Sequence, residues 1–149
     1  MARMRFVLAS TGEIAVTTAL KTVLSLTNAA NTRVAIRGFG VAFDSIGSTA
    51  GGAEVRLVIH STSGTFTGAT LRKDVRGTTE AFDTSGNHTA TVEPVVSEVL
   101  RSYTINQMTG YERAFAQDEE IELAGGDRFG LQIIASSGTN VNAFIAGEE

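Results

Sequence analysis

Apolar and polar residues alternate along the chain with the two-residue period of half-buried β-strands. The alternation is clearest at residues 33–37 and 54–60, where every second side chain is apolar. It returns near the end of the chain, at residues 129–133 and 141–145. No stretch longer than about ten residues has the 3.6-residue period of a helix, although residues 95–100 leave room for a short one. The pattern therefore predicts a chain built from β-strands.

One glycine coincides with a change of phase in this alternation. Val34 and Ile36 are the apolar positions before Gly38, whereas the apolar set after it begins at Phe39 and continues on alternate residues. An extra residue in one strand shifts the phase in this way, and glycine is common at such bulges. We therefore predict a β-bulge at Gly38 within one long strand.

The number and spacing of the strands predict the architecture. About eight to ten short strands, separated by Gly-rich turns, favour an antiparallel sandwich or barrel. The long Gly/Thr/Ser-rich stretch at residues 61–88 suits a jelly roll better than an immunoglobulin sandwich, whose Cys–Trp–Cys pattern is absent. We predict an all-β fold with a single antiparallel, jelly-roll-like β-sandwich at residues 11–149.

Residues 1–10 allow two interpretations. They could be an arm that adds a strand to a neighbouring molecule, or an edge strand of the same domain. In the first case Arg3, Arg5 and Phe6 would supply charged and apolar contacts to that partner. The apolar run here is too short for a signal peptide, so we expect synthesis in the cytoplasm without export.

Composition narrows the classes of function. The chain has no cysteine, so it can form neither disulfides nor thiolate metal sites. The net charge is −4 and the basic residues are scattered, so no nucleic-acid partner is expected. No segment approaches the roughly 20 apolar residues of a membrane helix, so no membrane partner is expected either.

The sequence contains few candidate catalytic or metal-binding residues. The two histidines, His60 on the outward face of a strand and His88 in a polar turn, are expected to be solvated and lack neighbouring metal ligands. The acidic run at residues 118–120 makes a calcium site conceivable, but charge runs are usually solvated. No nucleophile, base and orienting group can be assembled, so we predict a non-enzymatic protein without catalytic residues, cofactor or metal.

Several stretches together resemble small β-rich proteins of tailed bacteriophages. The stretches are residues 21–27, 33–44, 87–94, 140–143 and 148–149. The most specific is the His-Thr-Ala-Thr-Val-Glu-Pro run at residues 88–94. The resemblance is to virion proteins of the head-decoration, or cement, kind. It implies a structural protein on the capsid exterior that binds the major capsid protein and its own copies, as a homotrimer.

A second function remains open. Jelly-roll domains also serve as carbohydrate- or receptor-binding modules of phage tails and fibres, and fold alone does not separate the two roles. Glycan sites normally contain aromatic stacking residues, whereas this chain has no Trp and only two Tyr. Binding to glycans would favour the tail or fibre module, and many copies in each virion would favour decoration.

Overall fold

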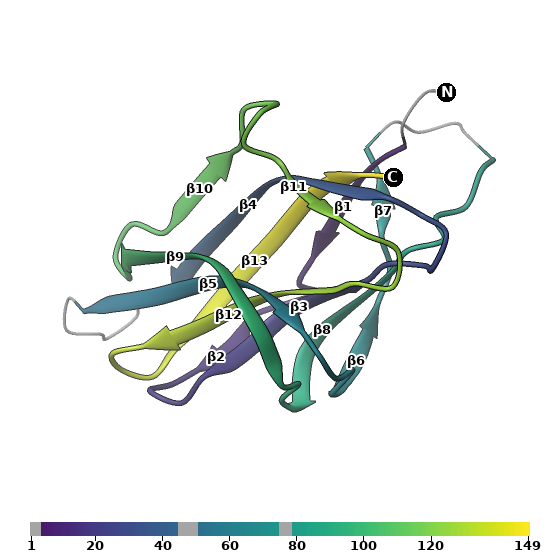
Figure 1. Ribbon diagram of the computed structural model, residues 1–149. Coiled ribbons are helices and arrows are strands. Elements are labelled where there is room, and N and C mark those ends of the chain that lie inside the picture. Colours follow the sequence, from purple (N-terminus) through teal and green to yellow (C-terminus); the bar gives the residue numbers. More distant parts are fainter. Residues whose placement is uncertain (1–3, 45–50, 75–78) are drawn as a thin grey trace.

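The computed structural model describes residues 4–44, 51–74 and 79–149, and every regular element in them is a β-strand. The strands form two antiparallel sheets packed face to face (Figure 1). The predicted all-β antiparallel sandwich is therefore confirmed, while the jelly-roll arrangement stays a prediction. The short helix considered at residues 95–100 is not formed, because these residues lie in a connector and in β9.

The first sheet has seven strands and carries both described ends of the chain. Its main path is β10 (Tyr111–Ala114), β4 (Val34–Asp44), β13 (Thr139–Glu148), β1 (Arg5–Ala9) and β7 (Arg72–Lys73). Two short strands lie off this path: β11 (Ile121–Leu123) pairs with β4, and β2 (Ile14–Val16) pairs with β13. Strands from both halves of the sequence thus lie side by side in one sheet.

The second sheet has six strands. Their order is β6 (Thr65–Ala69), β8 (Ser85–Val92), β3 (Lys21–Thr27), β12 (Arg128–Ala135), β5 (Gly52–His60) and β9 (Val96–Asn106). The inward side chains of both sheets fill one continuous apolar core, in which Phe6, Phe39 and Phe129 are among the largest fully buried residues. The burial of this core is the main stabilising contribution to the fold.

The predicted bulge at Gly38 is confirmed. The register between β4 and β13 shifts between Ile36 and Gly38, which leaves Arg37 as the extra residue. Ile36 and Phe39 can therefore both face the core, where each is 0% exposed. In a strand without a bulge, side chains three residues apart face opposite sides, so one of these two would face solvent.

The described part of the N-terminal segment is an internal strand. β1 pairs with β13 on one side and with β7 on the other, so it is neither a free arm nor an edge strand. Phe6 is 1% exposed and meets Phe82 edge-on at 5.7 Å, so its ring belongs to the core and is not presented to a partner. Arg5 is exposed opposite Glu148, and its contact role stays a prediction. Arg3 lies outside the described residues.

Asn28 joins three loops at one end of the sandwich. It is 2% exposed, its Nδ2 donates to the carbonyl oxygens of Thr32 (2.8 Å) and Ala124 (2.9 Å), and its Oδ1 accepts from Thr84 Oγ1 (3.3 Å). Asn28→Ala leaves the buried Thr84 hydroxyl and two loop carbonyl groups without this partner, so we expect the free energy of unfolding to fall by about 2–3 kcal/mol. Urea denaturation measures this, with the exposed Asn106→Ala as control; equal losses in the two variants would contradict the assignment.

Candidate functional site

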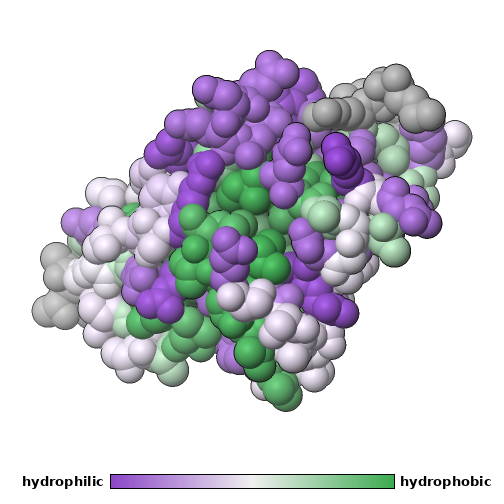
Figure 2. Space-filling view, in the orientation of Figure 1, coloured by the Kyte–Doolittle hydropathy of each residue, from purple (hydrophilic) through white to green (hydrophobic). Residues whose placement is uncertain are grey.

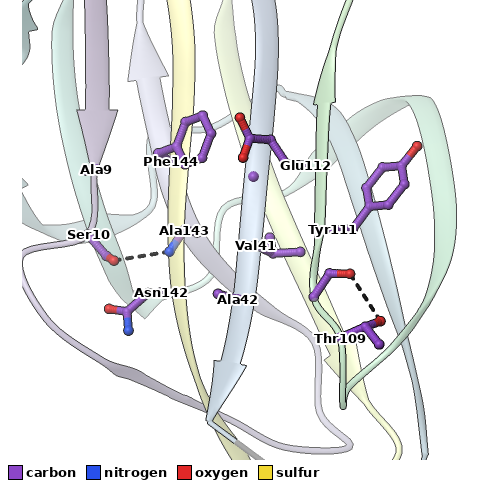
Figure 3. A pocket seen from close by; sticks show the side chains of 12 residues that line it. Ala9, Ser10, Val41, Ala42, Thr109, Tyr111, Glu112, Asn142, Ala143 and Phe144 are labelled. Carbon is purple, nitrogen blue, oxygen red and sulfur yellow. Dashed lines mark hydrogen bonds between the residues drawn. The ribbon is translucent and has the colours of Figure 1, made fainter.

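The outer face of the first sheet is uncovered and is floored by small residues. Gly40 and Ala42 of β4 and Ala9 of β1 help to line a hollow of about 630 Å³ (Figure 3). Small side chains leave the sheet backbone close to the surface, where another chain can approach it. The hollow therefore lies directly over the sheet and not in a gap between loops.

Phe144 is a large apolar side chain on this floor. The cross-strand register places Glu112, Gly40, Phe144 and Ala9 in one row across four strands. A Cβ atom on Gly40 would lie 2.2 Å from Phe144 Cε1, so the ring occupies the space that a side chain there would fill. Because Gly40 has no side chain, the half-buried phenyl ring can pack directly against the backbone of β4.

A second hollow continues the first along β4. It encloses about 250 Å³, is also lined by Glu112 and Phe144, and has Gly38 and Ala146 on its floor. From Ala42 to Gly38 the strand rises by about 13 Å, taking roughly 3.3 Å for each residue. We call the two hollows together the sheet groove; its length matches about four residues of an extended chain.

The larger part of the sheet groove offers packing surface and little reactive chemistry. Its serine and threonine hydroxyl groups are engaged with the backbone: Ser10 Oγ accepts from the Ala143 amide at 3.1 Å, and Thr109 Oγ1 donates to the Gly110 carbonyl oxygen at 3.4 Å. Among the described residues that line it there is no histidine, lysine or arginine.

Ion pairs balance the charges at the smaller end of the sheet groove. Arg37 contacts Glu120 at 3.1 Å and Glu148 at 2.9 Å. Arg113 contacts Glu119 at 3.1 Å, and this hydrogen bond raises the pKa of Arg113 and lowers the pKa of Glu119. The guanidinium groups are therefore already paired with carboxylates of the same molecule.

His60 is buried, so the expectation of a solvated side chain was wrong. It ends β5 and is 3% exposed, because its ring lies against Gly130, where a Cβ atom would come within 2.2 Å of His60 Cε1. Its Nε2 lies 3.5 Å from Gln132 Nε2, and its Nδ1 has no hydrogen-bond partner among the described residues. Burial lowers the pKa of His60 to about 4, so the ring is neutral at pH 7.

His88 is half-buried and belongs to a small hydroxyl cluster. Its ring nitrogens lie 3.1 Å from Thr11 Oγ1 and 2.9 Å from Thr89 Oγ1. In the described ranges, no three His, Asp or Glu side chains are grouped so that they could hold a metal ion. The acidic run at residues 118–120 contributes instead to ion pairs with Arg37 and Arg113.

The sequence analysis did not predict the sheet groove, although the position of Phe144 in the alternation indicated a surface feature. Val141, Ala143 and Ile145 are the inward residues of β13, so Phe144 falls on the outward phase. A large apolar residue at an outward position indicates a surface contact or a side chain that covers a glycine. The partner strand that supplies Gly40 lies about a hundred residues earlier in the sequence, and only the fold brings the two together.

Comparisons with known proteins add no relative. No model of a known protein family matches the chain, and neither a curated protein nor a solved structure matches it. In the described residues no helix is long and apolar enough to cross a membrane.

Proposed function

We propose that this chain is a non-enzymatic structural protein of a tailed bacteriophage, which decorates and stiffens the outside of the capsid as an oligomer. Its partners are the major capsid protein and its own copies. The observation that carries the proposal is the sheet groove, an uncovered surface floored by Gly40 and Ala42 around Phe144. The resemblance of the sequence to head-decoration proteins supports the same role.

The composition of the sheet groove supports binding to protein. The apolar floor residues can be buried in a contact without leaving polar side chains unsatisfied. The outward phenyl ring of Phe144 supplies contact area of the aromatic kind that is enriched in protein interfaces. Each contact can be weak, because a shell offers many identical sites and an oligomer occupies several of them together. In this proposal the protein is made in the host cytoplasm and acts on the capsid exterior.

A carbohydrate- or receptor-binding module of a tail or fibre is the second candidate. One observation favours it: both tyrosines of the chain lie together, with the ring centroids of Tyr103 and Tyr111 5.7 Å apart, and Tyr111 lines the sheet groove. Both rings also pack on Phe39, which explains their position without a ligand. Glycan-array binding that is lost in Tyr111→Ala would favour this candidate over decoration.

Binding to shells tests the leading proposal. Recombinant protein should co-sediment saturably with phage particles that lack it. Ala42→Arg places a long charged side chain on an exposed position in the groove, so we expect at least tenfold weaker binding. Ala15→Arg, at an exposed position of β2 in the same sheet, is the matched control and should bind normally.

The outcomes of this assay separate two claims. Absence of saturable binding by the unmodified protein would overturn the decoration role. Normal binding by Ala42→Arg would leave decoration standing but remove the sheet groove from it. Melting temperatures of the two arginine variants equal to that of the unmodified protein show that neither has lost its fold.

A further inference from the structure

One edge of the second sheet, strand β9, is open. β9 ends the strand order, so no described strand pairs with its outer side, and Figure 1 shows it crossing the front of the molecule. With 11 residues it is much longer than β6 at the opposite edge of the sheet, which has 5 residues. An edge strand presents unpaired N–H and C=O groups, which proteins commonly protect with Lys or Pro. β9 contains neither residue, so a strand of another molecule can pair with it.

A bulge places two opposite charges on one face of β9. The register pairs Glu98 with Ile59 of β5. Arg101 pairs with Leu57, and Leu100 is the extra residue of the bulge. Ile59 and Leu57 are two residues apart, so they point to the same side of β5, and so do the residues opposite them. Glu98 and Arg101 therefore share a face, although they are three residues apart in the sequence.

The sequence around this bulge is complementary to itself. Residues 96–103 read Val-Ser-Glu-Val-Leu-Arg-Ser-Tyr. When two copies of this stretch lie antiparallel about its midpoint, Glu98 of each copy stands opposite Arg101 of the other. The same register sets serine opposite serine, and valine opposite leucine or tyrosine. Opposite charges that face each other across paired strands stabilise the pairing, whereas like charges destabilise it. A shift by one residue in either direction removes both ion pairs.

Both charged groups are available for such a contact. Glu98 is exposed, and its carboxylate has no hydrogen bond or ion pair with any described residue. Arg101 is half-buried and held in place, because its Nη2 donates to the Glu119 carbonyl oxygen and its guanidinium lies 4.4 Å from the centre of the Phe115 ring. A guanidinium has several N–H donors, and none of the ion pairs among the described residues uses this one. Arg101 is therefore a positioned cation with free donors.

An exposed apolar side chain lies at the midpoint of the same stretch. Val99 is 49% exposed and is one of four large apolar side chains exposed in the described residues. Figure 2 shows apolar atoms on the front face, where Figure 1 draws the lower part of β9. In the antiparallel register Val99 of each copy stands opposite Leu100 of the other, so its side chain is removed from water. Burial of such exposed apolar surface favours association.

We propose that two copies join along β9, antiparallel about a two-fold axis between Val99 and Leu100, so that their six-stranded sheets become one continuous sheet. This inference rests on the proposed function, in which the chain acts as an oligomer, and it names the contact between copies. A two-fold contact is complete with two copies, so it predicts a dimer in place of the homotrimer that the resemblance implies. The sheet groove lies on the first sheet, so each copy keeps it free for the capsid.

Exchanging the two charges tests the pairing and its register. Glu98→Arg sets like charges opposite each other across the axis, and so does Arg101→Glu. For each variant alone we expect the dissociation constant of the dimer, measured by analytical ultracentrifugation, to rise about a hundredfold. An equal mixture of the two should restore dimers, because every arginine then faces a glutamate, and this also shows that both variants are folded. Glu122→Arg, at an exposed position of β11, is the control and should dimerise normally.

Engineered cysteines test the position of the two-fold axis. The chain has no cysteine, so any disulfide must come from the introduced residues. A disulfide needs Cα atoms about 4.4–6.8 Å apart, so it reports positions that lie directly beside the axis. Under mild oxidation Val99→Cys should give a cross-linked dimer. Val92→Cys is the control, because Val92 is 60% exposed but lies away from the axis, and it should give none.

Failure of the pairing and failure of the proposed function are distinguishable. An unmodified protein that is trimeric, or monomeric well above micromolar concentration, overturns the β9 pairing. A mixture of the charge variants that stays monomeric while the unmodified protein dimerises overturns it as well, and so does the absence of a Val99→Cys cross-link. Binding to shells and the copy number in particles do not depend on β9, so they test decoration separately.

Discussion

Lowering the pH from 7 to 4 should remove about 3 kcal/mol of the free energy of unfolding through His60 alone, at 1.36 kcal/mol for each pKa unit. Burial holds the pKa of His60 near 4 in the folded protein, against 6.5 for an ordinary histidine. The unfolded chain therefore binds more protons than the folded one in this window. The stabilisation is complete above pH 6.5 and is lost as the pH falls towards 4.

Urea denaturation at a series of pH values measures this loss. His60→Phe keeps a planar ring against Gly130 and removes the titration, so its stability should fall much less between pH 6.5 and 4. His88→Asn is the control, because His88 is half-buried, and it should keep the acid sensitivity of the unmodified protein. The same slope in His60→Phe as in the unmodified protein would contradict the assignment.

Phe39→Ala should destabilise the protein by about 4 kcal/mol, which is a large part of the stability of a domain of this size. Phe39 is 0% exposed, and its ring centroid lies 5.3 Å from Tyr103, 5.9 Å from Tyr111 and 6.2 Å from Phe115. These rings close the side of the sandwich where β9 and β10 lie. Truncation leaves a cavity that rigid sheets on both sides cannot fill.

Thermal or urea unfolding measures this effect, with Phe66→Ala as the matched control. Phe66 lies in β6 at the opposite edge of the second sheet and is only half-buried, so it should lose far less. Equal losses in the two variants would show that the aromatic cluster is not a central part of the core. Because Tyr111 also lines the sheet groove, Phe39→Ala should weaken binding to shells as well.

Local patterns were enough to predict the fold class and one detail of it. The two-residue period places Val55 and Leu57 in the core, and both are 0% exposed. The phase change at Gly38 predicts the bulge in β4, since a bulge alters the alternation of the strand that contains it. Both features depend on neighbouring residues of one strand, so a single sequence contains them.

Features that depend on distant strands could not be predicted in this way. The alternation correctly gave His60 an outward phase, yet the ring is buried against Gly130 on a strand seventy residues further along. Phe6 was considered as a partner contact, whereas β13 and β7 enclose its strand from both sides. The packing of Phe144 against Gly40 depends likewise on strand order. Strand order is decided by the packing of the whole domain and leaves no local pattern in the sequence.

The copy number of this protein in purified phage particles tests the central claim most directly. Quantitative mass spectrometry should compare it with the most abundant shell protein of the same particles. Decoration predicts hundreds of copies in a simple ratio to the shell protein, since each repeat of the lattice offers the same site. A handful of copies would contradict decoration and indicate the tail, and complete absence from the particles would contradict a virion role of any kind.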